Sequence, residues 1–375
     1  MSEVRNVFIN TRLMERRITI DGLNLCFLFD DCVFRHNYVI ATYYLKQGGG
    51  EGDIKSLMNI IKEGRFVKPL YVYLDSGGFQ LFTGSGTSIP EGVVNAAVQL
   101  SRLLGNDGII YMTLLDYPSS LISLSNDEFE KRLAKTVEYY TRQLDYYYHG
   151  GMEQKNIRVI MPIQGGIRER VERFMRQMSP LIRDYGITGY ALTGITGREF
   201  HDSEWIESNL ERLSALSRGV LDSGSRVIDI HFLAYFEKRL WYVGAVAEAS
   251  GFRTVTADSM AVIDYIERYQ YLVPSIPTPI HLHLKYLSRL VCNCPICTII
   301  ERNNGVEKAV QGVKPYNVFI SLHNLYAYLN FSKIALNYPR IGIEAMGINY
   351  DSLISKIKTA VKGEYQRGLL GFLRK

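Results

Sequence analysis

The chain has 375 residues, of which 47% are hydrophobic and 22% are charged. These proportions exclude disordered, collagen-like and coiled-coil proteins, and the length predicts one large globular unit that could carry an insertion. No window reaches 18 uninterrupted apolar residues, and the start has no basic segment before an apolar run. We therefore expect neither a membrane span nor a signal peptide, and a cytoplasmic protein.

The formal net charge of +5 is unevenly distributed along the sequence. Residues 281–375 contain thirteen Lys and Arg against five Asp and Glu, whereas residues 1–280 contain 30 basic and 33 acidic residues. A basic C-terminal part on a nearly neutral body is typical of proteins that bind a polyanion such as a nucleic acid. A solvated basic surface would give the same count, so the charge alone leaves both interpretations open.

Short apolar runs rich in β-branched and aromatic residues alternate with stretches of helical periodicity. Each run stops at a polar residue or glycine, which is typical of buried strands that end in functional side chains. The predicted strands, in chain order, are 70–74, 109–115, 157–163, 190–192, 227–230 and 254–257. The predicted helices are 91–104, 125–149, 168–185, 202–217 and 236–250. Ser125 followed by Glu128 is a capping-box signature and marks the start of the second of these helices.

Strands that alternate with helices predict an α/β protein with a parallel sheet and right-handed crossovers. Six such units, with a further strand near residues 37–45, favour a (β/α)8 TIM barrel. An open, doubly wound sheet is the alternative, but the first strand-to-helix turn lacks the Gly-x-Gly-x-x-Gly pattern of that class.

Three of the five cysteines fall within one short segment, Cys292-Asn-Cys294-Pro-Ile-Cys297. An odd number of cysteines in a chain without an export signal disfavours a disulfide framework, and thiolates at this spacing are typical of a metal site. The candidates for a fourth ligand are His281, His283 and His323. Four protein ligands would leave no open position for water, so we expect a structural Zn²⁺.

A proline-rich segment separates the predicted barrel from the cysteine cluster. Three prolines lie between residues 274 and 279, where they oppose regular structure. We predict that residues 1–275 form the main part of the catalytic barrel and that residues 276–335 form a small zinc-binding subdomain. We expect residues 336–375 to form a helical segment that packs back on the barrel.

Two aspartates follow predicted strands that are far apart in the sequence. Asp75 opens the segment DSGGFQ, and Asp258 follows another strand 183 positions later. In a barrel both would face one mouth, where one carboxylate can attack an acetal-like carbon while the other moves protons. A single aspartate at a strand end can equally be the N-cap of the next helix, so the pair carries the prediction. We expect Gly77 and Gly78 to let a planar ligand approach the backbone, with Phe79 behind them.

These features occur in the order typical of one family. The sequence resembles the tRNA-guanine transglycosylase superfamily in five features: DSGGFQ at 75–80, IQGG at 163–166, GYALTG at 189–194, Asp258 after a strand, and Cys-x-Cys-x-x-Cys followed by a histidine. Members of this superfamily are zinc-containing (β/α)8 barrels that exchange guanine in a polynucleotide for a 7-deazaguanine. The resemblance spans roughly residues 70–330, and DSGGFQ together with the cysteine pattern is its most specific part.

The resemblance implies roles for the two aspartates and completes the ligand set. Asp258 matches the family nucleophile, which attacks C1′ of the nucleotide, expels guanine and holds the sugar until the incoming base displaces it with overall retention. Asp75 matches the aspartate that assists the departure of guanine and takes a proton from the new base, with support from Ser76. His323 matches the fourth ligand of the zinc ion.

The resemblance also implies how guanine is recognised. Asp116 in LLDYP matches the base-reading aspartate, which accepts hydrogen bonds from N1–H and the N2 amino group. Gln164 and backbone N–H groups near Gly165 and Gly194 would donate to O6, and Phe79 would stack on one face of the base.

Two departures from the family pattern favour a branch that modifies DNA. Members that act on tRNA usually follow the nucleophile with Pro-Thr-Arg, whereas Ser-Met-Ala follows Asp258 here, and Thr193 stands where glycine is common. The DNA-modifying branch, often encoded by bacteriophages, inserts 7-deazaguanines such as preQ0. We therefore expect DNA and the free base as partners.

Two alternatives remain open at this point. The first is a tRNA enzyme of the queuosine or archaeosine type, and the second is a catalytically silent, zinc-bearing subunit of such an enzyme. Silent subunits tend to lose the nucleophile, and the presence of both Asp75 and Asp258 disfavours that interpretation. The sequence is compatible with a homodimer or with a partner protein.

Overall fold

The structure is a computed structural model. It describes residues 4–10, 19–20, 23–24, 38–43, 54–64, 66, 68–84, 86–119, 123–193, 201–235, 237–259, 270–273, 275–286, 290, 292–302, 305–311 and 316–366.

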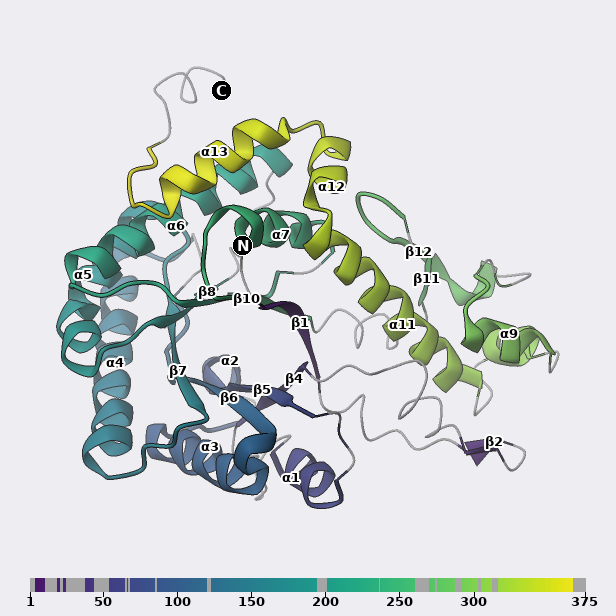
Figure 1. Ribbon diagram of the computed structural model, residues 1–375, viewed down its shortest axis with the longest axis horizontal. Coiled ribbons are helices and arrows are strands. Elements are labelled where there is room, and N and C mark those ends of the chain that lie inside the picture. Colours follow the sequence, from purple (N-terminus) through teal and green to yellow (C-terminus); the bar gives the residue numbers. More distant parts are fainter. Residues whose placement is uncertain are drawn as a thin grey trace.

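Eight parallel strands form a sheet that closes on itself (Figure 1). In their order around the barrel the strands are β1 (Val4–Asn10), β10 (Thr254–Ser259), β9 (Asp229–Leu233), β8 (Gly189–Thr193), β7 (Ile157–Ile163), β6 (Gly108–Thr113), β5 (Leu70–Asp75) and β4 (Tyr38–Thr42). Pairing of β1 with both β10 and β4 closes the ring. The predicted α/β architecture with a curled parallel sheet is therefore confirmed.

Helices line the outside of this sheet (Figure 1). They are α1 (Ile54–Lys62), α3 (Pro90–Leu104), α4 (Asn126–Leu144), α5 (Arg168–Tyr185), α6 (Asp202–Asp222), α7 (Arg239–Ala249) and α11 (Tyr316–Asn337). The short helix α2 (Gly78–Thr83) follows β5 and is seen within the ring of strands in Figure 1. Between β1 and β4 the described residues contain a short hairpin of β2 (Thr19–Ile20) and β3 (Leu23–Asn24), and no helix.

The local signals in the sequence correspond to real helix ends. The side chain of Ser125 accepts a hydrogen bond from the backbone N–H of Glu128 and caps α4, as the capping box predicts. The helix predicted to end at 149 instead changes at Asp145 into one π-helical turn, Asp145–His149. The helix predicted from 236 starts at Arg239.

Side chains from successive strands fill the interior of the barrel. Ile40, Tyr73, Tyr111, Ile160 and Ala191 form one buried cluster and come from β4 to β8. Two larger clusters lie between the strands and the outer helices. The barrel is thus a packed core, and polar chemistry is confined to its ends.

After β10 the chain forms several short elements before it returns to the barrel in α11. The short elements are a hairpin of β11 (Gln270–Val273) and β12 (Ile280–His283), the 3-10 turn Leu284–Tyr286, α9 (Pro295–Arg302) and α10 (Val306–Val310). The long helix α11 then packs on α7 and β1 as well as on β11 and α9. This helix therefore belongs to the barrel wall and to the cysteine-bearing region at once.

The last two helices cover the barrel helices from outside (Figure 1). α12 (Pro339–Ala345) packs on α7, and α13 (Tyr350–Ala360) packs on α6 and α7. Lys356 and Tyr365 both contact the carboxylate of Glu207 on α6. The boundaries at 275 and 335 stay a prediction, because α11 spans the second of them.

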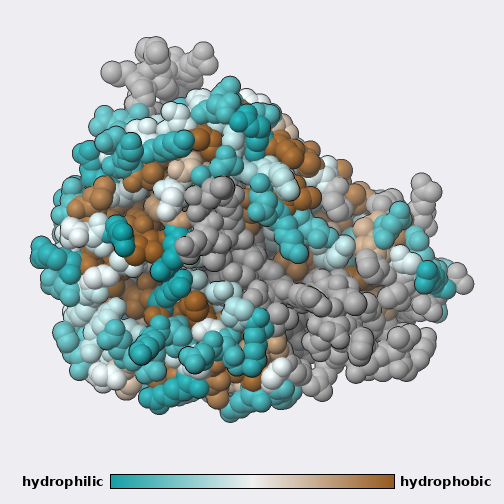
Figure 2. All heavy atoms as spheres, in the orientation of Figure 1, coloured by the Kyte–Doolittle hydropathy of each residue, from teal (hydrophilic) through white to brown (hydrophobic). Residues whose placement is uncertain are grey.

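The visible outer face is mostly polar. Figure 2 shows hydrophilic side chains over the outer helices, with hydrophobic patches between them. Among the residues that the structure describes, no helix is both long and apolar enough to cross a membrane.

Replacement of Gly342 by alanine should destabilise the contact between α12 and α7. An added Cβ at this position would lie 2.0 Å from Cδ2 of Trp241, whose ring is fully buried. We expect Gly342→Ala to lower the free energy of unfolding by about 1–3 kcal/mol, measured by equilibrium denaturation in urea. The exposed control Ser355→Ala on α13 should change it little. Equal stability of both variants would contradict this packing.

Candidate active site and metal centre

The carboxyl ends of the barrel strands bring the predicted site residues to one edge, which we call the carboxyl-end rim. Asp75 is the last residue of β5, and Asp258 is the second-last residue of β10. Asp116 is the third residue after β6, and Gln164 follows β7 directly. Because all eight strands are parallel, these ends meet at the same edge of the barrel.

Asp75 is held by neutral donors. Its carboxylate accepts hydrogen bonds from Thr42 Oγ1, at 3.2 Å, and from the backbone N–H groups of Ser76 and Gly77. These bonds lower its pKa, but burial and the charge of Asp258 act more strongly and raise the pKa to about 6. Asp75 can therefore both hold and release a proton near neutral pH.

Asp116 is buried beside Gln164. The side-chain amide of Gln164 donates to Oδ2 of Asp116, and its carbonyl oxygen accepts from the backbone N–H of Ser119 at 3.0 Å. Burial, followed by the charge of Asp75, raises the pKa of Asp116 to about 7. The structure thus joins the residue that was assigned to N1–H and the N2 amino group with the residue that was assigned to O6, and these groups are neighbours on one edge of the base.

The two glycines of DSGGFQ have structural reasons to be glycine. Gly77 has a φ of 77°, in the left-handed region, and precedes α2. A Cβ on Gly78 would lie 2.6 Å from Oδ1 of Asp116 and 2.7 Å from its backbone oxygen. Position 78 must therefore be glycine, because Asp116 packs directly against it. The sequence pattern had indicated a different reason, the approach of a ligand to the backbone.

Asp258 is 6% exposed and is held mainly through one oxygen. Its Oδ1 accepts a hydrogen bond from the backbone N–H of Ala234, which follows β9 with an unusual φ of 60°. The Nε2 atom of His231 lies 3.7 Å from the same oxygen. His231 lies on β9 and Ala234 directly follows it, and β9 pairs with β10.

The three carboxylates at the rim act on one another. The charge of Asp258 raises the pKa of Asp75, and the charge of Asp75 raises that of Asp116. All three raise the pKa of the buried Tyr73 beneath them. Such a group can supply a nucleophile and a proton donor at adjacent positions, because repulsion keeps a proton on the cluster near neutral pH.

Several buried polar atoms near these acids have no hydrogen-bond partner among the described residues. They include Oγ of Ser76, Oγ of Ser119 and Oε1 of Gln80. Buried polar atoms are nearly always paired in folded proteins, so unpaired ones at the rim are available to a ligand. Two predicted contacts cannot be compared, because Gly194 and the side chain of Phe79 lie outside what the structure describes.

Arg212 on α6 connects two of the rim segments and carries no sequence signal of its own. It is fully buried, and its guanidinium donates to the backbone oxygens of Gly165, at 3.0 Å, and Thr193, at 2.6 Å. Burial lowers its pKa. The predicted donor segment after β7 is thus fixed to the end of β8.

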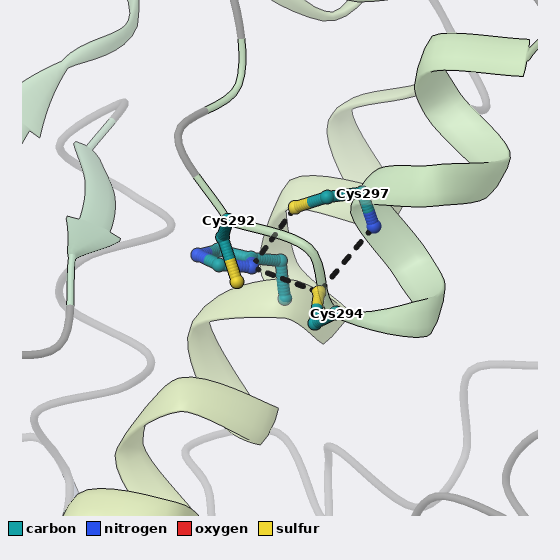
Figure 3. A group of neighbouring side chains, drawn as sticks. Cys292, Cys294 and Cys297 are labelled. Atoms are coloured by element: carbon teal, nitrogen blue, oxygen red, sulfur yellow. Dashed lines mark hydrogen bonds between the residues drawn. The ribbon is translucent and has the colours of Figure 1, made fainter.

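The cysteine cluster forms a four-residue site (Figure 3). One ligand atom from each of Cys292, Cys294, Cys297 and His323 can be chosen so that all lie within 4.8 Å of one another. Nδ1 of His323 lies 3.3 Å from Sγ of Cys294 and 3.2 Å from Sγ of Cys297. These residues could hold a metal ion such as zinc.

The surroundings of His323 fix which nitrogen faces the sulfurs. Its Nε2 lies 2.8 Å from the backbone oxygen of Leu272, which can only accept, so Nε2 carries the proton and Nδ1 offers a lone pair. The ring stacks on Tyr271 at 4.1 Å between centroids, and the Tyr271 hydroxyl lies 3.2 Å from Sγ of Cys297. Asn324 binds the backbone of both Gln270 and Leu272 and so ties β11 to α11.

His281 and His283, the other two candidates for the fourth metal ligand, contact groups outside the cysteine cluster. His281 lies 3.1 Å from Oε1 of Gln270 and 3.0 Å from Oε1 of Glu237. His283 is exposed and accepts a hydrogen bond from the backbone N–H of Lys285. The geometry therefore favours His323 as the fourth member of the site.

No known protein family matches the chain, and no curated protein matches it. Among solved structures, it is similar to an endo-beta-N-acetylglucosaminidase from Cordyceps militaris in apo form, with 13% identity, a TM-score of 0.31, and coverage of 69% of this chain and 81% of that chain. It is also similar to dihydrodipicolinate synthase from Bacillus clausii, with 9% identity, a TM-score of 0.30, and coverage of 86% and 96%. At these scores the similarities carry no argument about activity.

Replacement of Asp116 by asparagine should stabilise the protein, and more so at higher pH. The folded-state pKa of about 7 lies above the unfolded value, so the stability from the protonated carboxyl is present below about pH 4 and is lost as the pH rises through 7. We expect the free energy of unfolding of Asp116→Asn to be higher than that of the wild type by up to about 4 kcal/mol at pH 8, and by little at pH 4. Urea denaturation at both pH values measures this, with the exposed Asp222→Asn as control. A pH-independent difference would contradict it.

Removal of His323 should remove a bound metal. We expect the purified protein to contain about one zinc ion per chain, and His323→Ala to lose it and to melt at a lower temperature, because the ligand set also holds β11 against α11. His283→Ala is the matched control and should keep the metal. Elemental analysis and calorimetry measure both effects. Equal zinc contents in the two variants would exclude His323 as a ligand.

Proposed function

We propose that the protein is a DNA-guanine transglycosylase that exchanges guanine in DNA for a free 7-deazaguanine base such as preQ0. The observation that carries this proposal is the convergence of Asp75, Asp116 and Asp258 at one rim, where their charges interact. Base exchange with retention needs a nucleophile, a proton carrier and a base-reading acceptor in one place, and the three acids are suited to these roles.

In this proposal Asp116 and Gln164 read the base. A carboxylate accepts from N1–H and the N2 amino group of guanine, while an amide N–H of Gln164 can donate to O6. The unpaired Oγ atoms of Ser76 and Ser119 add further donors or acceptors. A base with a different donor pattern would leave these buried groups unpaired, which is the basis of strong discrimination.

The exchange proceeds in two displacements. An oxygen of Asp258 forms a bond to C1′ while the C1′–N9 bond breaks, and its electron pair leaves with guanine, which takes a proton from Asp75. The incoming base then gives its N9 proton to Asp75, forms a bond to C1′, and releases the carboxylate of Asp258. Two inversions at C1′ give retention, and every group of the protein is regenerated.

The environment of Asp75 suits the proton carrier. A group with a pKa of about 6 is divided between its two protonation states near neutral pH, so it can donate in the first displacement and accept in the second. The Thr42 hydroxyl and two backbone N–H groups hold it in place during both.

The metal is proposed to be zinc with a structural role. Three thiolates and one imidazole would supply the four ligands that zinc takes in structural sites, so the set would leave no position for a reactive water. The ion would hold β11 and α9 against α11, and the chemistry would belong to the aspartates.

DNA is preferred to tRNA as the substrate on two grounds. The segment after Asp258 lacks the arginine of the tRNA enzymes, and the basic residues of 281–375 can bind a phosphate backbone. In a duplex the target guanine must leave the stack, at a cost of about a few kcal/mol. A homodimer or a partner protein that opens the duplex is compatible with this scheme.

A base-exchange assay tests the proposal. The protein is incubated with labelled guanine and either duplex DNA or unmodified tRNA, and a covalent adduct is sought on a denaturing gel. We expect label and adduct with DNA, and a loss of exchange by more than about 10³-fold in Asp258→Asn, which keeps the side-chain shape. Asp75→Asn should bind DNA and fail to turn over, whereas Asp222→Asn should match the wild type.

The outcomes separate the alternatives. Exchange into tRNA alone would overturn the DNA assignment while supporting transglycosylation. Neither exchange nor adduct with any DNA or RNA would overturn transglycosylation itself and favour a silent subunit.

A further inference from the structure

One buried ionisable residue at the site has no role in the scheme above. His231 lies on β9 inside the barrel, is 2% exposed, and stacks on Tyr73 with 3.9 Å between ring centroids. Burial lowers its pKa, so the imidazole is neutral near pH 7. Burial of the two polar ring nitrogens costs free energy unless each has a partner, so the contacts of both nitrogens need to be identified.

The neighbours of His231 determine its tautomer. Nδ1 lies 2.9 Å from Oγ1 of Thr256, a hydroxyl that can donate or accept. Nε2 faces Oδ1 of Asp258 at 3.7 Å, and a carboxylate can only accept. The tautomer that satisfies both contacts has the Thr256 hydroxyl donating to Nδ1 and the proton on Nε2, directed at Asp258.

The two oxygens of Asp258 are therefore in different environments. Oδ1 faces the His231 ring and accepts from the backbone N–H of Ala234. Oδ2 accepts no hydrogen bond from the part of the chain that the structure describes. A φ of 60° at a non-glycine residue is strained, and at Ala234 it turns the N–H toward Asp258. Both constraints act on the same oxygen.

We propose that His231 is a positioning residue that, together with the N–H of Ala234, holds Oδ1 of Asp258 and so leaves Oδ2 as the attacking oxygen. This inference rests on the proposed function. In the first displacement Oδ2 bonds to C1′ as the C1′–N9 bond breaks, and the remaining C=O of the ester is Oδ1, which keeps its hydrogen bond from Ala234 and faces Nε2 of His231. The imidazole stays neutral throughout and transfers no proton.

The distance of 3.7 Å fits this role. Hydrogen bonds of catalytic groups are often long before the substrate binds and shorten in the complex. The stack on Tyr73 and the contact with Thr256 prevent rotation of the ring, so Nε2–H stays directed at Asp258. A fixed donor of this kind acts through the orientation of the carboxylate and needs no change of charge.

Two substitutions test the N–H donor of His231 separately from its aromatic ring. His231→Phe keeps the aromatic stack on Tyr73 and removes the donor, whereas His231→Gln can place an amide N–H near the position of Nε2. With DNA in excess, we expect the rate of adduct formation to fall about 100-fold in His231→Phe and to be largely restored in His231→Gln. The affinity for DNA should be unchanged in both, because the effect lies on the chemical step.

The wild-type protein offers an independent readout. Nitrogen-15 NMR of histidine-labelled protein distinguishes the two neutral tautomers, and the His231 signal is identified by its absence in His231→Gln. We expect the proton on Nε2. A proton on Nδ1 would overturn the inference even if His231→Phe failed to fold.

The results distinguish this inference from the function on which it rests. If the wild type forms no adduct, the proposed function fails. If it forms an adduct and folded His231→Phe forms it at the same rate, the role of His231 fails and the function stands. Equal losses in the Phe and Gln variants would also overturn the donor role.

Discussion

The site depends on three carboxylates whose negative charges repel one another, of which Asp116 and Asp258 are buried and Asp75 is partly buried. Among the residues that the structure describes, no Lys or Arg pairs with Asp75, Asp116 or Asp258, and the donors that hold them are backbone N–H groups, a threonine hydroxyl and an amide. A guanidinium would stabilise the charged form and hold each pKa low. Neutral donors hold the carboxylates in place without preventing them from taking up a proton near neutral pH. Repulsion between the carboxylates lowers the stability of the folded protein, and the packing of the closed barrel offsets this cost.

The metal centre connects to that barrel through one helix. His323 lies on α11, which packs on β1 and α7 and so completes the wall around the strands. The same helix holds β11 through Asn324, and β11 presents the backbone oxygen of Leu272 that fixes the His323 ring. A metal ion at the four ligands would therefore fasten the hairpin and α9 to an element that the barrel already orders.

Much of this arrangement could be predicted from the sequence because local patterns encode it. Apolar runs located most of the barrel strands, the cap at Ser125 located α4, and the spacing of the cysteines located the metal cluster. β1 was missed, because its apolar run Val7–Ile9 is only three residues long, follows two polar residues, and is followed by no predicted helix. The convergence of Asp75 and Asp258 was predictable only through the barrel, since parallel closure turns strand ends into neighbours.

The remaining features could not be predicted, because each depends on a partner that only the closed barrel supplies. In the sequence His231 is one polar residue in an apolar strand, and its meaning depends on Thr256 and Asp258 across the β9–β10 ladder. The same holds for Gly78. The sequence pattern indicated that this glycine gives a ligand access to the backbone, whereas in the structure it leaves room for Asp116. A sequence pattern reports which residue is unusual. What that residue does depends on the opposing strand, and closure of the barrel places this histidine between Thr256 and the carboxylate of Asp258.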